Sequence, residues 1–209
     1  MDIIDLHTHR ENKNAITSVS PFNFFPEPGY YYSVGIHPWE IQQVDLNKEE
    51  WVLLQELSNH PQVVAIGEVG LDKVKGGEMD LQLEWFKKQI NLAGKQRKPL
   101  IVHAVRTANE IIHLRKELKS HIPWVIHGFR NNEHIAQQLL QHDFYLSFGE
   151  KYSVEALRCV PLEKMFIETD ESEKDIYKIY KQIATHLRIP QEYLEMRIKA
   201  NMEKIFFNQ

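Results

Sequence analysis

The sequence predicts an α/β protein built as a single-domain, eight-stranded (β/α)8 barrel over residues 1–209. Three observations lead to this prediction. Short apolar segments alternate with longer segments whose apolar residues recur at helical spacing, a pattern typical of right-handed βαβ units and a parallel sheet. Eight such apolar segments can be counted, the number that closes a barrel. No repeat, low-complexity tract or linker divides the chain.

The expected strands are short and rich in β-branched and aliphatic residues. Because side chains alternate across a strand, His7 and His9 at the end of the first one leave on the same side. The strands are expected at residues 1–6, 15–19, 31–36, 63–68, 100–103, 124–127, 144–148 and 165–168.

Helical spacing, as at Trp51, Leu54 and Leu57, marks most of the segments between these strands. The predicted helices span residues 46–59, 80–97, 108–119, 133–141, 154–160, 176–187 and 191–207. The first helix of the barrel is missing, because only residues 10–14 follow the first strand's histidines before the second strand. The proline- and aromatic-rich segment 21–29 is predicted to be irregular. It either packs over the exposed barrel flank or stacks nucleic-acid bases.

Composition indicates an ordinary globular protein of the cytoplasm. A net charge of −4 excludes the general basic surface of non-specific DNA binders. The single cysteine, Cys159, excludes an internal disulfide and fits a reducing compartment. The sequence contains neither a signal peptide pattern nor an apolar run that could span a membrane, and no obligate protein partner is evident.

Metal-capable side chains occupy the ends of the predicted strands. Barrel enzymes place their chemistry at the carboxyl ends of the strands, so such residues would meet at one mouth. Any one of them alone could be a capping or solvated residue, but their common position predicts a metal site. These residues are His7, His9, Glu68, His103, His127 and Asp170.

The ligand types indicate the chemistry. Imidazole and carboxylate without thiolate suit zinc, manganese, iron, nickel or magnesium. The set suffices for one or two divalent ions, with Glu68 bridging two, and such a pair activates water for hydrolysis. We expect Asp170 to hold one ion and to orient or deprotonate the attacking water, which makes Asp170 and Glu68 the candidate catalytic residues.

Several motifs resemble those of the TatD family of metal-dependent hydrolases. Asp5-Leu-His-Thr-His9 and Glu168-Thr-Asp170 are joined, in family order, by segments 34–38, 65–72, 99–103 and 126–129 and by Asn201. The resemblance implies a TIM-type barrel, a divalent metal centre and, typically, deoxyribonuclease activity. Carried over residue by residue, it implies one ion on His7, His9, Glu68 and Asp170 and a second on Glu68, His103 and His127.

The chain departs from the family pattern near the expected substrate. Trp39 stands where a second histidine is usual, Arg130 replaces a serine, and Glu171 and Ser172 follow Glu-Thr-Asp in place of a small residue and a proline. Glu171 adds negative charge that disfavours a polyanion.

Four residues are candidates for substrate contact. Lys73, Arg106 and Arg130 can each hold a phosphate, or be solvated surface charges. His37, just past the third strand, is a candidate for contacting the substrate or supporting the metal ligands, with a structural turn as the alternative.

The leading interpretation is therefore a metal-dependent phosphodiesterase acting on DNA. Alternatives are a hydrolase of a small ester, lactone or amide on the same fold, and a non-enzymatic metal-dependent binding protein. The opening motif also resembles the PHP phosphoesterases, but only His186 follows Asp170, where that group would need further histidine motifs.

Overall fold

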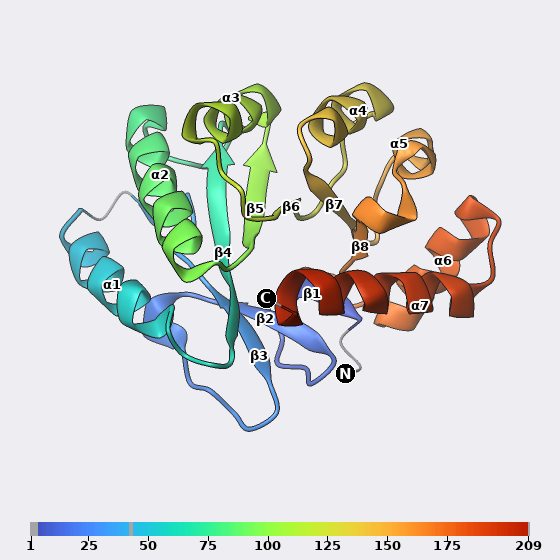
Figure 1. Ribbon diagram of the computed structural model, residues 1–209, viewed down its shortest axis with the longest axis horizontal. Coiled ribbons are helices and arrows are strands. Elements are labelled where there is room, and N and C mark those ends of the chain that lie inside the picture. The colour runs from blue at the N-terminus through green and yellow to red at the C-terminus, as the bar shows by residue number, and fades with distance from the viewer. Residues whose placement is uncertain (1–3, 42–43, 209) are drawn as a thin grey trace.

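The computed structural model describes residues 4–41 and 44–208, and its eight strands form one parallel sheet ordered as in the chain (Figure 1). Each strand pairs in parallel with the next, as the βαβ pattern predicts. The expected first strand begins at residues 1–3, which lie outside the described part of the chain. The strands are β1 (Asp5–Thr8), β2 (Ala15–Val19), β3 (Tyr31–Val34), β4 (Val63–Asp72), β5 (Leu100–Val105), β6 (Trp124–Ile126), β7 (Tyr145–Phe148) and β8 (Met165–Ile167).

The barrel closes where β1 meets the end of β8. A parallel bridge joins Thr8 to Asp170, and the Asp170 N–H donates to the His7 carbonyl at 2.9 Å. Beside it, the Asp5 carboxylate accepts from the Thr169 N–H and hydroxyl at 3.0 and 2.7 Å. This seam confirms the predicted barrel.

Helices surround most of the sheet (Figure 1). Their positions match the predicted segments to within two residues at nearly every boundary, the last helix excepted. Among the helices that the structure describes, none combines the length and apolar character of a membrane span. They are α1 (Val44–Leu57), α2 (Met79–Gln96), α3 (Ala108–Leu118), α4 (Glu133–Gln141), α5 (Val154–Cys159), α6 (Ile176–Leu187) and α7 (Gln191–Met202).

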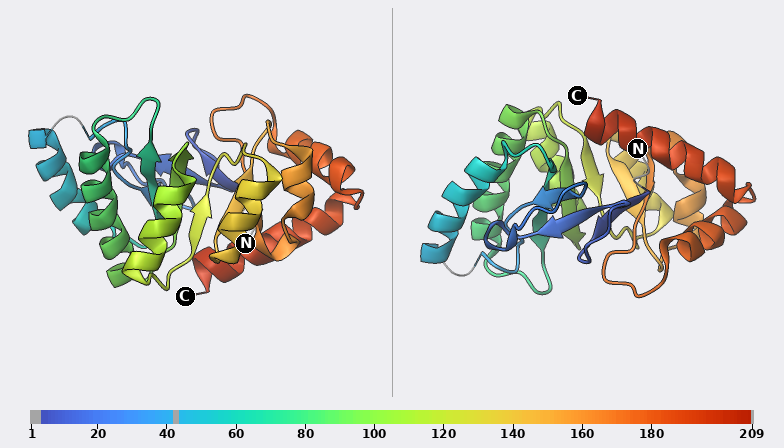
Figure 2. Two further views of the ribbon diagram at one scale, coloured as in Figure 1. Left: turned by 90° about the horizontal axis from the view of Figure 1, so that it is seen from above. Right: turned by 90° about the horizontal axis from the view of Figure 1, so that it is seen from below.

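The helix after β1 is missing, as predicted, and the link from β2 to β3 contains only a 3-10 turn, η1 (Pro21–Asn23). In Figure 2, right, strands β1 to β3 accordingly lie at the front with no helix over them. The aromatic segment is split between packing and exposure. Phe24 packs against Tyr32 and His60, whereas Phe25 is 73% exposed.

The last predicted helix, 191–207, is interrupted: α7 ends at Met202 and continues as a π-helical turn, η3 (Glu203–Phe207). The wider turn lets Ile205 and Phe206 both reach the core, where Phe206 contacts Phe166 at the start of β8. The sequence pattern alone could not show this change of pitch.

Strand β4 is buried along its whole length and extends four residues beyond the predicted end at 68. A register shift between Ile66 and Val69 accompanies the extension. Gly70 has φ of +146°, and a Cβ there would lie 2.0 Å from the His103 carbonyl oxygen, so only glycine lets β4 approach β5 this closely. Glu68 and His103 therefore lie within their strands, where we had expected strand ends.

Candidate metal centre

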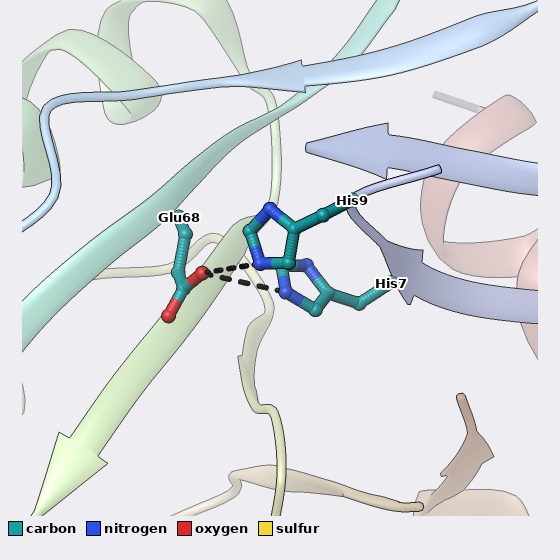
Figure 3. Close-up of side chains that lie close together, drawn as sticks. All are labelled: His7, His9 and Glu68. Atoms are coloured by element: carbon teal, nitrogen blue, oxygen red, sulfur yellow. Dashed lines mark ion pairs between the residues drawn. The ribbon is translucent and has the colours of Figure 1, made fainter. Parts of the chain in front are cut away.

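All six predicted metal-capable residues meet at one mouth of the barrel, around Glu68. The Nε2 atoms of His7 and His9 lie 3.4 and 3.5 Å from Glu68 Oε2 (Figure 3). The same two nitrogens lie 3.6 and 3.7 Å from Asp170 Oδ1. Two histidines, one in β1 and one directly after it, thus face two carboxylates, one from β4 and one from the loop after β8.

The other oxygen of Glu68 faces a second group of histidines. Glu68 Oε1 lies 2.6 Å from His103 Nδ1, 2.7 Å from His127 Nε2 and 3.1 Å from His37 Nε2. The backbone N–H of Trp39 donates to His37 Nδ1. A neutral His37 therefore carries its proton on Nε2 and donates it to Glu68. His37 therefore joins this cluster as a hydrogen-bond donor.

The donor set fits a divalent cation. The His7 ring is fully buried, yet neither of its nitrogens has a hydrogen-bond partner among the described residues. A buried imidazole without a partner is rare in native proteins. The separations of 3.4 and 3.6 Å between the His7 Nε2 and the two carboxylates exceed a typical hydrogen bond. They match the spacing, about 3–3.7 Å, of two ligands that share one ion.

The charges of the cluster are strongly coupled. Burial raises the pKa of Glu68, but the nearby charge of His127 and the close contacts with the rings of His103, His127 and His37 outweigh it and hold that pKa well below its usual range. Burial lowers the pKa of His127, but Glu68 and Glu168 raise it well above the usual value. The interaction with the Glu68 carboxylate also raises the pKa of His9. Glu68 is thus held as the anion that a cation site needs.

Three buried carboxylates that sequence reasoning had not assigned support these residues. Burial raises the pKa of Asp5 to about 7, and its oxygens accept from Thr169 and from the His7 N–H. Glu168 is fully buried, 3.6 Å from His127 Nδ1, and accepts from the Gly128 N–H. Asp5 and Glu168 each precede a predicted ligand by two residues, and Asp72 follows Glu68 by four. For Asp5 and Glu168, an acidic residue inside a predicted apolar strand was the available signal, because buried carboxylates occur almost only with partners. Asp72 lay beyond the predicted end of its strand and gave no such signal.

Asp72, at the end of β4, is the third of these carboxylates. Its Oδ2 accepts from His103 Nε2 at 3.0 Å and from the Trp39 indole N–H at 2.7 Å. Its Oδ1 accepts from the backbone N–H groups of Val74 and Lys75. Burial raises the pKa of Asp72, but these hydrogen bonds outweigh it and hold the pKa far below its usual value.

A cavity of about 840 Å³ opens above the cluster. His37, Arg106 and Arg130 line it, as the substrate predictions require, and Arg130 lies 3.7 Å from Asp170 Oδ2. Lys73 does not line it: its ammonium is 2.5 Å from Glu110 on α3. Lys75 lines the cavity instead, because the turn after β4 directs the second lysine toward the mouth.

A parallel eight-stranded barrel with a buried histidine–carboxylate cluster at its mouth has the form of the metal-dependent barrel hydrolases. The family model described as TatD related DNase matches residues 6–207. The chain belongs to this family.

Named relatives agree with the assignment. The chain is similar to the uncharacterized metal-dependent hydrolase YabD of Bacillus subtilis, 32% identical over 149 residues that cover 67% of this chain and 58% of that protein. It is also similar to deoxyribonuclease Tat-D of Schizosaccharomyces pombe, 28% identical over 66% of this chain and 50% of that protein. The matched part of the chain thus spans little more than half the length of these relatives.

The fold recurs in a solved structure. YJJV, a TatD homologue from Escherichia coli, superimposes with a TM-score of 0.78 over 92% of this chain and 85% of that one, at 20% identity. At this identity the likeness supports the fold alone. It indicates that the present chain keeps the barrel architecture although it has no helix between β1 and β2.

Proposed function

We propose that the protein is a divalent-metal-dependent phosphodiesterase that cleaves DNA. The observation that carries the proposal is the position of Glu68, whose two oxygens face two different groups of histidines. A carboxylate placed in this way can bridge two ions, an arrangement common in enzymes that hydrolyse phosphate esters. The name of the Schizosaccharomyces relative supports DNA as the substrate. The single free cysteine supports a site of action in the cytoplasm.

The ligand sets follow from the same distances. One ion would be held by His7, His9, Glu68 Oε2 and Asp170, and the other by Glu68 Oε1, His103 and His127. Ions of the zinc, manganese, iron, nickel or magnesium type suit these donors. When bound, they supply Lewis-acid chemistry: they lower the pKa of water and neutralise charge on the phosphate.

The chain's own residues position the substrate and move the proton. Asp170, with its second oxygen toward Arg130, accepts the proton from the water that attacks phosphorus. Arg130 and Arg106 on the cavity wall bind the non-bridging phosphate oxygens. The His37 Nε2–H donates to Glu68 Oε1 at the edge of the cavity, and so His37 orients the carboxylate that would hold both ions. The P–O bond to the leaving alkoxide then breaks, and the alkoxide takes its proton from solvent water in the open cavity.

The test is a metal-reconstitution assay. Chelator-treated protein is titrated with magnesium, manganese or zinc and assayed on short single- and double-stranded DNA. We expect nucleotide release to return with metal and to fall by about 10²–10⁴-fold in Asp170→Asn. Asp80→Asn is the matched control, because Asp80 is exposed in the first turn of α2 and does not line the cavity. DNA that stays intact although metal binds would refute the nuclease assignment, and full turnover by Asp170→Asn would refute the role of Asp170.

The second candidate is hydrolysis of a small ester, lactone or amide. Glu40 and Glu171 on the cavity wall favour it, because both add negative charge next to an incoming phosphate. Small carboxyl and phosphate esters, assayed beside DNA with the same metal-loaded protein, separate the two functions. A higher kcat/KM for a neutral ester than for any phosphodiester would establish the alternative.

A further inference from the structure

Trp39, in the turn after β3, stands between the metal centre and the cavity. Its ring makes edge-on contacts with His37 and His103, with ring centroids 4.7 and 5.6 Å away. Trp39 lines the cavity, and 41% of its surface stays exposed. A large apolar ring is therefore presented to the cavity directly beside two histidines of the cluster.

The indole is fixed in position relative to the metal ligands. Its N–H donates to Asp72 Oδ2, the same oxygen that accepts from His103 Nε2. Asp72 is 1% exposed, so the carboxylate that joins the two rings is itself held by the core. A tryptophan that only filled the core would not combine a hydrogen bond from its indole N–H to Asp72 with a ring that stays exposed to the cavity.

Lys75 adds a positive charge at the same place. Its backbone N–H donates to the other oxygen of Asp72, and its ammonium lies 4.3 Å from the centroid of the Trp39 ring. Lys75 also lines the cavity and is exposed. The contact between a solvated ammonium and an aromatic face is weak, so an incoming group can replace it.

We propose that Trp39 and Lys75 form a nucleotide subsite: the indole stacks on the base of the nucleotide joined to the scissile phosphate, and the ammonium pairs with a neighbouring phosphate. The proposal rests on the proposed nuclease function and extends it to substrate recognition. Stacking of a base on a tryptophan is tolerant of sequence, because every base has a π-face. The subsite would thus favour nucleotides over other phosphate esters without reading a particular base.

The experiment compares short oligodeoxynucleotides that differ only in whether the residue next to the scissile bond carries a base or is abasic. With the metal-loaded wild type we expect kcat/KM to be about 10-fold or more higher for the substrate with the base. Trp39→Leu should bring this ratio close to unity, whereas Trp39→Phe, which keeps a ring but loses the bond to Asp72, should retain most of it. Tyr193→Leu on α7, an aromatic residue of similar exposure away from the cavity, is the matched control.

A merely structural role for Trp39 predicts a different result. In that case Trp39→Leu would lower the rates on both substrates equally and leave their ratio as in the wild type. That outcome, or a wild-type ratio of one, would overturn the subsite while the nuclease function stood.

A binding measurement keeps the two proposals separable. Calorimetry on the metal-loaded protein compares a deoxynucleoside 5′-monophosphate with deoxyribose 5-phosphate. If no phosphodiester is cleaved, the nuclease function fails and this comparison alone decides the subsite. Affinity about 10-fold higher for the nucleotide, lost in Trp39→Leu, supports it, and equal affinity for the two ligands overturns it.

Discussion

Replacing Asp72 by asparagine should weaken metal binding although Asp72 is not among the proposed metal ligands. The carboxylate accepts four hydrogen bonds, two at each oxygen. Asparagine has one acceptor oxygen, and the two backbone N–H groups of Val74 and Lys75 are placed to keep it. The amide NH2 then faces His103 Nε2 and donates to it, which moves the imidazole proton to Nδ1. That nitrogen lies 2.6 Å from Glu68 and is the one we assign to the ion.

The magnitude follows from these contacts. Loss of a hydrogen-bonded partner behind a metal-binding histidine typically costs about 10- to 100-fold in metal affinity. The part-buried indole N–H of Trp39 also loses its acceptor, which costs about 1 kcal/mol of folding stability. For a chain of this size, each kcal/mol lowers Tm by about 2–4 °C.

The assay is a competition titration of chelator-treated protein against a metal indicator, beside thermal unfolding of the metal-free forms. Asp80→Asn serves again as the control for loss of one negative charge. An Asp72→Asn protein that is folded and binds manganese and zinc as tightly as the wild type would refute the tautomer argument. A fall in Tm without any change in affinity would leave Asp72 a structural residue only.

Three further predictions test other parts of the structure. Lys73→Ala should leave DNA cleavage unchanged and lower the free energy of unfolding in denaturant by at most about 1 kcal/mol, because Lys73 is partly exposed and pairs with Glu110 away from the cavity. A large rise in KM would show that Lys73 reaches substrate. Asn201→Ala should lower stability by about 1–3 kcal/mol, because the amide donates to the Leu162 and Met165 carbonyls and one of these bonds is buried; an unchanged denaturation midpoint would contradict this. A metal ion at about 100 times its Kd should stabilise the fold by about 2.7 kcal/mol and raise Tm by about 5–11 °C. A thermal scan with and without metal measures this shift, and an unchanged Tm would argue against a specific site.

The strand pattern and the convergence of the metal-capable residues could be predicted from the sequence because each depends on local spacing. Alternation within β1 put His7 and His9 on one side, and the barrel rule brought Glu68, His103 and Asp170 to the same mouth. The short link at residues 10–14 left no room for a helix, and the structure has none there.

Other features depend on contacts between distant segments, which spacing does not reveal. The length of β4 depends on the close approach that Gly70 permits against His103. The orientation of Lys73 away from the mouth depends on Glu110 of α3, 37 residues away. The supporting role of Asp72 depends on Trp39 and His103, which come from two other βα units. In each case the partner had to be placed before the role could be assigned.

The seam that closes the barrel also bears on how the protein is made. Thr8 contacts Asp170 although 162 residues separate them in the chain. His7 and His9, on either side of Thr8, both face the carboxylate of Asp170. During synthesis, the amino-terminal histidines leave the ribosome long before Asp170 exists. A newly made chain therefore cannot offer the complete His7–His9–Glu68–Asp170 set until β8 has emerged and docked against β1. An ion that needs all four of these donors can consequently be held only by chains that are nearly finished.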